Sequence, residues 1–181
     1  VKRRGLALIL KQEALELNPE IARLIIHPDK DTARLALTTS LTLSDRALKT
    51  RDRPVSERAL LSAASLIRKF QPDYADKLVG ELNFGVVETA VPALFALRHL
   101  LDDVKAREIL MRLLHHADPK IRATSALQMG LTVGRQYPDL LSKPLEDADA
   151  RVRANAIEAL GRLNNKRLAR VVQRFRSDEH S

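Results

Sequence analysis

The side chains best able to do chemistry in this chain are basic, and they gather near its C-terminal end. Residues 151–176 contain eight arginines and lysines and a single acid, Glu158, which gives this stretch a formal charge of +7. A clustered basic face attracts polyanions and acidic partners. Five of these residues define the candidate basic face: Arg151, Arg162, Lys166, Arg170 and Arg174.

Lys166, Arg170 and Arg174 are spaced four residues apart, so on a helix they form one row. A nucleic acid could bind such a row through its phosphates alone, with an affinity that falls steeply with salt. Recognition of bases usually adds aromatic stacking, yet Phe175 is the only aromatic residue of this region. The alternative interpretation is a solvated face, or a face whose charges meet acidic residues of further repeats.

Other residues that could support catalysis or metal binding are scattered. The neighbours His115 and His116 point in different directions on a helix, so they do not offer two metal ligands on one face. The sequence has no Cys, no His-Glu-x-x-His motif, no phosphate-binding glycine loop and no nucleophile elbow around any Ser. We therefore predict no catalytic residues, no metal and no cofactor.

The elements that must position the basic face are revealed by a repeat. Asp-Pro-Lys-Ile-Arg-Ala at 118–123 is echoed by Asp-Ala-Arg-Val-Arg-Ala at 149–154, 31 residues later, and the echo continues to Gly130 and Gly161. A fixed period of this size indicates stacked units, each too small to bury its apolar face alone. The first Asp of each segment is a predicted N-cap, because it directly precedes its helix.

The composition favours an all-helical protein. Of the 181 residues, 45% are apolar and only 3% aromatic, so the core must be built from Leu, Ala, Ile and Val. Ala and Leu are the strongest helix formers, and no alternating run bounded by hairpin turns calls for a strand. We predict an all-α fold, an α-α superhelix of about five helical hairpins, forming a single domain over residues 1–181. No stretch of eighteen apolar residues is present, so we predict no membrane insertion within this segment.

Weaker forms of the repeat occur upstream. A β-branched residue followed four positions later by a small one recurs at 152, 121, 86, 55 and 32. The pattern predicts helices near 3–16, 19–27, 31–43, 54–70, 72–82, 85–101, 103–115, 118–132, 136–146, 149–163 and 165–176. The segment 44–53 is expected to be a short helix or a long turn. Pro92 falls inside a predicted helix, which it should kink or deprive of an amide hydrogen bond.

The segment from Leu145 to Leu163 strongly resembles a HEAT repeat, an Asp-rich turn followed by Val-Arg and then by Ala and Leu at helical spacing. It is most similar to the short bacterial form also found in phycobilisome bilin lyases. The preceding repeat is similar but has His116 where Asp147 stands. Clear resemblance covers residues 103–181. Further upstream Val87 and Ser56 stand where the motif Arg should be.

The resemblance implies a structural role for the motif's charged residues, since in HEAT-like arrays Asp and Arg pair within and between adjacent repeats. Asp147 or Asp149 would pair with Arg153, and Asp118 with Arg122. These five residues form the predicted ladder. The family motif specifies a fold and says little about activity.

Three functions follow as hypotheses. The first is a non-catalytic scaffold whose second helices line a surface for another protein, or for another domain of the same polypeptide. The second is a polyanion-binding module that uses the basic face on the backbone of a nucleic acid. The third, an enzyme subunit like the bilin lyases, would need a pigment pocket that the sequence does not offer convincingly. We expect a cytoplasmic location and a chain that is a piece of a longer array; Lys2-Arg3-Arg4 would also suit a segment just inside a membrane span.

Overall fold

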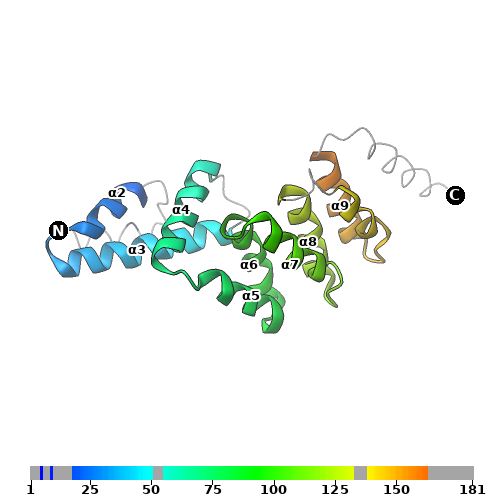
Figure 1. The fold of residues 1–181 in the computed structure, drawn as a ribbon, viewed down its shortest axis with the longest axis horizontal. Helices are drawn as coiled ribbons and strands as arrows, with labels where there is room; N and C mark the ends of the chain where they lie inside the picture. The colour runs from blue at the N-terminus through cyan, green and yellow to red at the C-terminus, as the bar shows by residue number, and fades with distance from the viewer. Residues whose placement is uncertain (1–4, 6–8, 10–17, 51–54, 133–137, 163–181) are drawn as a thin grey trace. The chain divides into compact units, whose positions relative to one another are not determined.

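The computed structural model describes residues 5, 9, 18–50, 55–132 and 138–162 (Figure 1). Within these ranges every regular element is a helix, and no strand occurs. By their contacts the residues form two compact units, the first of residues 1–80 and 95–100 and the second of residues 81–94 and 101–181. The fold of the described residues is therefore all-α, as the sequence predicts.

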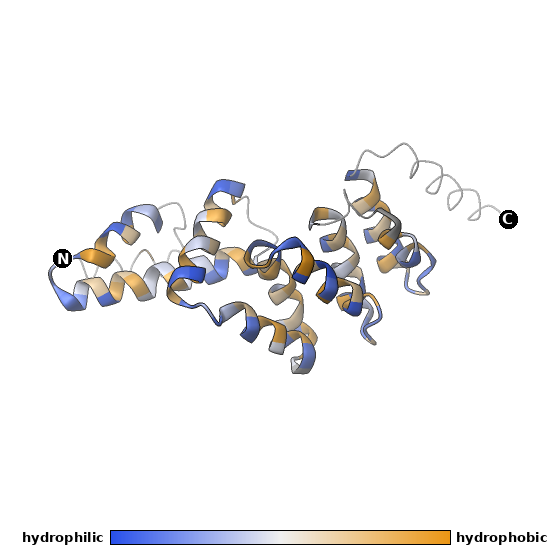
Figure 2. Ribbon diagram, viewed as in Figure 1, coloured by the Kyte–Doolittle hydropathy of each residue, from blue (hydrophilic) through white to orange (hydrophobic). Residues whose placement is uncertain are grey.

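The first unit is built around one long helix. Its elements are α2 (Asn18–Arg23), the 3-10 turn η2 (Leu24–Ile26), α3 (Lys30–Lys49) and α4 (Glu57–Phe70). The carboxylate of Asp29 accepts a hydrogen bond from the backbone N–H of Thr32 at 2.8 Å and so caps α3. Helix α3 packs against α2 and α4, and its residues Ala36 and Leu43 share a buried cluster with Ile21. In Figure 2 hydrophobic and hydrophilic residues alternate along α3, as in an amphipathic helix.

Helix α3 is longer than the sequence predicts. The prediction ended it at residue 43 and left residues 44–53 as a short helix or a long turn, whereas the helix continues to Lys49. Leu43, Ala47 and Leu48 are all buried. Because residues four apart lie on one face of a helix, Leu43 and Ala47 extend the apolar stripe by a further turn, and Leu48 widens it.

Helices α5 (Tyr74–Phe84) and α6 (Val87–Leu100) each contribute residues to both units. Pro92 lies inside α6, as predicted, and removes one N–H from its hydrogen-bond ladder. In the first unit Arg68 donates to the carbonyl of His99 at 2.8 Å. The pKa of His99 is lowered, first by burial and then by the nearby Arg98, with Glu57 acting in the opposite direction. The folded state therefore favours the neutral imidazole of His99.

The second unit contains a helical hairpin followed by one more long helix. Its elements beyond α6 are α7 (Asp103–Leu113), α8 (Pro119–Thr132), the 3-10 turns η3 (Pro138–Leu141) and η4 (Lys143–Glu146), and α9 (Ala150–Arg162). Asp102 caps α7 by accepting from the N–H of Lys105 at 2.8 Å. Helix α8 packs against both α7 and α9. No described helix is both long enough and apolar enough to cross a membrane.

The predicted helix over residues 136–146 is wrong in type. The described part of this segment forms the two short 3-10 turns η3 and η4 instead of one α-helix. Pro144 lies within the first two positions of η4, where its missing N–H costs nothing. In the middle of an α-helix the same proline would have removed a ladder hydrogen bond and clashed with the preceding turn.

Helices α8 and α9 lie side by side and run in the same direction. The side-chain amide of Asn155 donates to the carbonyl of Ala123 at 2.9 Å. Further along both helices, Gly130 lies against Ala159, and a Cβ added at Gly130 would meet the Cβ of Ala159 at 2.4 Å. Residues early in α8 contact residues early in α9, and later residues contact later ones, so the two helices are parallel. Because Gly130 has no side chain, the two helices can approach closely at that position.

One polar side chain of α8, that of Gln128, is buried without a hydrogen-bond partner among the described residues. Gln128 is 1% exposed, and neither its amide nitrogen nor its amide oxygen has a hydrogen-bond partner among the described residues. Replacing Gln128 with Met keeps the length of the side chain and its helix propensity while removing the unpaired amide. We expect the free energy of unfolding to rise by about 1–2 kcal/mol, measured by urea denaturation.

A charged control separates this effect from a simple change in packing. Gln128→Glu has nearly the same size and should be destabilising, because it places an unpaired carboxylate in the same site. A Met variant no more stable than the wild type would mean that the amide of Gln128 is already satisfied.

Candidate interaction surface

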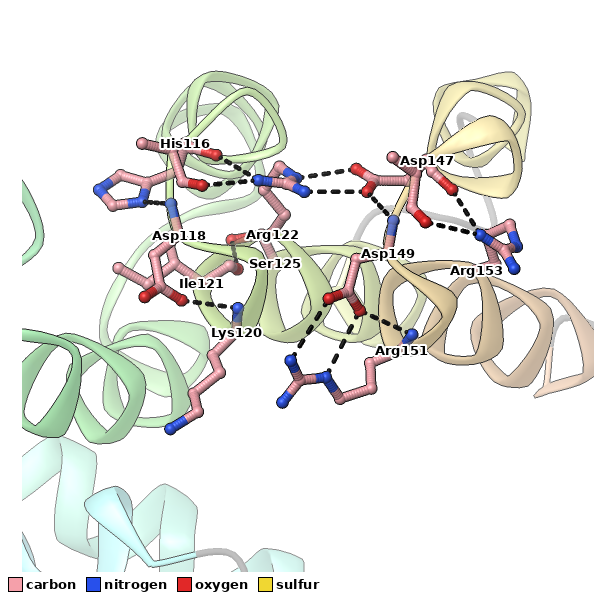
Figure 3. A network of polar contacts seen from close by, with 12 residues as sticks. His116, Asp118, Lys120, Ile121, Arg122, Ser125, Asp147, Asp149, Arg151 and Arg153 are labelled. Atoms are coloured by element: carbon pink, nitrogen blue, oxygen red, sulfur yellow. Dashed lines mark hydrogen bonds and ion pairs between the residues drawn. The ribbon is translucent and has the colours of Figure 1, made fainter.

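The turn before α9 is held by two carboxylates in succession. Asp147 Oδ1 accepts a hydrogen bond from the N–H of Asp149 at 2.9 Å, and Asp149 Oδ1 accepts from the N–H of Arg151 at 2.8 Å (Figure 3). The second contact caps α9, as the sequence predicts. The pKa of Asp149 is lowered by the hydrogen bond from the Arg151 side chain first and by the backbone N–H of Arg151 second. The turn is thus fixed by contacts between residues only two positions apart.

The same turn precedes α8, with a histidine in place of the first carboxylate. His116 Nδ1 accepts from the N–H of Asp118 at 3.0 Å, and Asp118 Oδ1 accepts from the N–H of Lys120 at 2.7 Å. A third example precedes α3 in the first unit, where His27 Nδ1 accepts from the N–H of Asp29 at 3.1 Å. This third turn was not predicted from the sequence, although it shares with the second the signal His-x-Asp directly before a helix.

Arg122 joins two successive turns through a single guanidinium group. Its Nη1 donates to the carbonyls of His116 and Ala117, both at 2.9 Å, and so holds the turn before its own helix. Its Nε and Nη2 donate to the two carboxylate oxygens of Asp147, at 2.8 and 2.9 Å. A bidentate pair of this kind fixes geometry as well as charge. Figure 3 shows the guanidinium of Arg122 between the two turns.

The Arg122–Asp147 pair is shielded from solvent. The two side chains are 18% and 14% exposed, respectively. The hydrogen bond between them raises the pKa of Arg122 and lowers that of Asp147, and in both residues burial acts in the opposite direction. The N–H of Asp149 adds to the lowering at Asp147. Both groups are therefore held in their charged forms, and the pair depends on both partners being present.

Arg153 binds the turn before α9 in the same way that Arg122 binds the turn before α8. Its Nη1 donates to the carbonyls of Asp147 and Ala148, at 2.8 and 3.0 Å. Asp147 therefore accepts hydrogen bonds from Arg122 at its carboxylate and from Arg153 at its backbone carbonyl. This links α8, the intervening turn and α9 in one chain of hydrogen bonds.

The structure brings together the five residues of the predicted ladder, but the predicted side-chain pairs of Asp118 with Arg122 and of Asp147 or Asp149 with Arg153 are wrong. Arg122 meets Asp147 of the following turn, whereas Asp118 uses its carboxylate as a cap. Asp149 is likewise a cap, and Arg153 donates to backbone carbonyls. The cross-turn contact joins residues 25 positions apart, so it depends on how the helices stack and cannot be found from local spacing.

The candidate basic face is only partly described. Arg151 pairs with Asp149 at 3.3 Å, and Arg162 pairs with Glu158 one helical turn away at 2.6 Å. Both arginines are exposed, so these pairs contribute little to stability. The other three members, Lys166, Arg170 and Arg174, lie outside the described residues. The structure thus shows no joint surface formed by the five.

Next to the ladder, α7 exposes two large apolar side chains. Val104 is 56% exposed and Met111 is 42% exposed. They are seven residues apart, close to two helical turns, so they lie on one side of α7. Arg122 and Asp147 also border a polar hollow of about 400 Å³, whose other lining residues are Leu114, His115, His116, Lys143, Pro144 and Glu146. Among the described residues no group of three or more His, Asp or Glu side chains is placed to hold a metal ion.

Comparison with known proteins identifies the repeat. The family model for HEAT repeats matches residues 108–181, the part of the chain that contains the Arg122–Asp147 pair and α8 and α9. No curated protein and no solved structure matches the chain. The parallel helices, the capped turns and the arginine that bridges successive turns agree with this match, and residues 108–181 are similar to HEAT repeats.

Proposed function

We propose that this chain is a non-catalytic HEAT-repeat scaffold that binds another protein. The observation that carries the proposal is the double engagement of Arg122, which fixes two successive turns and the two helices that follow them. A surface held in this way is already ordered before a partner arrives, so binding costs little conformational entropy. HEAT repeats generally act as scaffolds of this kind.

The exposed apolar side of α7 is the surface that we expect the partner to contact first. The centres of protein interfaces are enriched in large apolar residues and depleted in charge. Val104 and Met111 are exposed apolar residues of this kind. On α8 and α9 the most exposed long side chains include Lys120, Arg151 and Arg162, which suit the polar rim of an interface. Two apolar residues do not make an interface of about 800 Å² on each partner, so neighbouring helices must contribute the rest.

The test uses a photo-crosslinking amino acid at residue 111 in cells that make the protein. We expect a specific crosslinked partner at Met111 and none at Arg58, an exposed residue of α4 that serves as the matched control. Substituting Val104→Ser together with Met111→Ser should reduce capture of that partner at least tenfold, while Lys105→Ser on the same helix should leave it unchanged.

Other outcomes would count against the proposal. Equal crosslinking at both positions, or none at either, would remove α7 as the contact surface. Retention of the protein on duplex DNA or RNA at low salt, lost steeply as salt rises, would favour the polyanion hypothesis instead. A spectral shift on adding a bilin pigment would favour the enzyme-subunit hypothesis. The short bacterial subtype of the repeat stays a prediction.

A further inference from the structure

The last turns of α6 are attached to α4 by a small group of charged side chains in the first unit. Residues 95–100 of α6 belong to that unit, together with α4. Arg68 of α4 donates from Nη1 to the carbonyl of His99 at 2.8 Å and so satisfies a backbone oxygen at the C-terminal end of α6. Arg98 Nη2 lies 3.3 Å from Glu57 Oε2 on α4. Polar contacts thus join the end of one helix to the other.

The imidazole of His99 lies within this group. Its side chain is only 7% exposed, whereas that of Glu57 is 60% exposed. His99 Nδ1 lies 3.7 Å from Glu57 Oε1, which is too far for a hydrogen bond. Among the described residues, the charges that act on the ring are those of Arg98, the preceding residue, and Glu57. The ring is therefore buried beside a cation, and its nearest carboxylate lies largely in solvent.

A proton on this ring would be poorly compensated. The carboxylate of Glu57 is already shared with Arg98, and solvent screens an exposed carboxylate. Burial and Arg98 both lower the pKa of His99, and Glu57 opposes them only in part. The imidazole binds a proton more tightly where it reaches water, which requires the end of α6 to leave α4. Because a proton binds this released state better, acid shifts the population toward it.

We propose that protonation of His99 releases residues 95–100 of α6 from α4, so that the first unit loosens in acid at this one contact. The pKa of His99 is lowered in the folded state. The stabilisation from the neutral ring is therefore complete above the unfolded pKa of about 6.5 and is lost as pH falls through that value toward the lower folded pKa. The inference is independent of which protein the scaffold binds.

Hydrogen exchange of the whole chain, followed by NMR, measures the release. An unpacked last turn frays, so the amides of residues 97–100 should lose protection by at least about threefold between about pH 7.5 and about pH 5.5, after correction for the intrinsic exchange rates. His99→Gln is neutral at every pH and should abolish this loss. Glu57→Gln removes the opposing carboxylate and should enlarge it. His115→Gln, at an exposed histidine of the second unit, is the matched control and should leave the loss unchanged.

A second measurement covers the case in which His99→Gln disturbs folding. The side-chain NMR signals of the five histidines report the protonation of each ring in the wild-type chain. His99 should become charged over the same pH range in which residues 97–100 lose protection.

Three results would overturn the proposal. Equal losses of protection in the wild type and His99→Gln would show that another group responds to acid. Loss of protection while the ring of His99 stays neutral would lead to the same conclusion. Equal losses along α3, α4 and residues 97–100 would mean that acid unfolds the whole first unit instead of releasing the end of α6.

Discussion

Replacing Gly130 with valine should separate α8 from α9 and lower the free energy of unfolding of the second unit by more than about 3 kcal/mol. A Cβ at this position would lie 2.4 Å from the Cβ and 2.9 Å from the Cα of Ala159. The obstacle includes the backbone of the neighbouring helix, so no rotation of a side chain relieves it. The two helices would have to move apart and lose the packing between them. Urea denaturation followed by circular dichroism measures the loss.

Gly161 provides the matched control, since it is the equivalent glycine one repeat later. A Cβ added at Gly161 meets no described atom within 4 Å, so Gly161→Ala should be neutral or stabilise by up to about 1 kcal/mol through better helix propensity. If Gly130→Val is as stable as the wild type, α8 and α9 do not approach as closely as described here. If both substitutions are equally harmful, Gly161 has a close neighbour as well.

Removing the side chain of Arg122 should cost about 2–3 kcal/mol of unfolding free energy. Arg122→Met keeps the aliphatic stem but loses the hydrogen bonds to two turn carbonyls and to Asp147. The carboxylate of Asp147, only 14% exposed, is then left without its main partner. Arg151→Met, at an exposed arginine on α9, is the control and should change stability by less than about 1 kcal/mol. Equal losses for the two variants would mean that the ladder contributes no more than a surface ion pair.

The same pair should make stability depend on acid. The pKa of Asp147 is lowered in the folded state, mainly by Arg122. Its contribution is therefore fully present above the unfolded pKa of about 3.9 and is lost as pH falls through that value and toward the lower folded pKa. Unfolding free energies measured from pH 6 down to pH 3 should converge for the wild type and Asp147→Asn as the pH decreases. Curves that stay parallel over this range would show that Asp147 titrates normally in the folded chain.

The repeated segment predicted the first residues of α8 and α9 to within one position, together with their caps. This worked because a cap, a helix start and an apolar face are all set by residues a few positions apart. The all-α fold followed for the same reason. The turns η3 and η4 were mistaken for one helix because the apolar pattern of that segment outweighed Pro144 in the prediction, whereas the missing N–H decides in the molecule.

The partner of Arg122 could not be predicted from the spacing of nearby residues. Asp118 is nearer in sequence, but its carboxylate is occupied by the N–H of Lys120, and only the stacking of the helices brings Asp147 within reach. The exposed stripe of Val104 and Met111 was not predicted either. Whether an apolar residue of an amphipathic helix is covered depends on which neighbours the helix has, and the sequence of α7 alone does not contain that information.

The contact of Arg122 with Asp147 is also directional. In this pair the arginine belongs to the earlier turn and the aspartate to the later one, so the contact has a direction along the chain. A twofold axis brings two copies of the same edge together, so it cannot reproduce a contact in which the edge of one turn meets the different edge of the next. A further unit that repeats this contact must therefore stack head to tail, in the direction in which the chain runs.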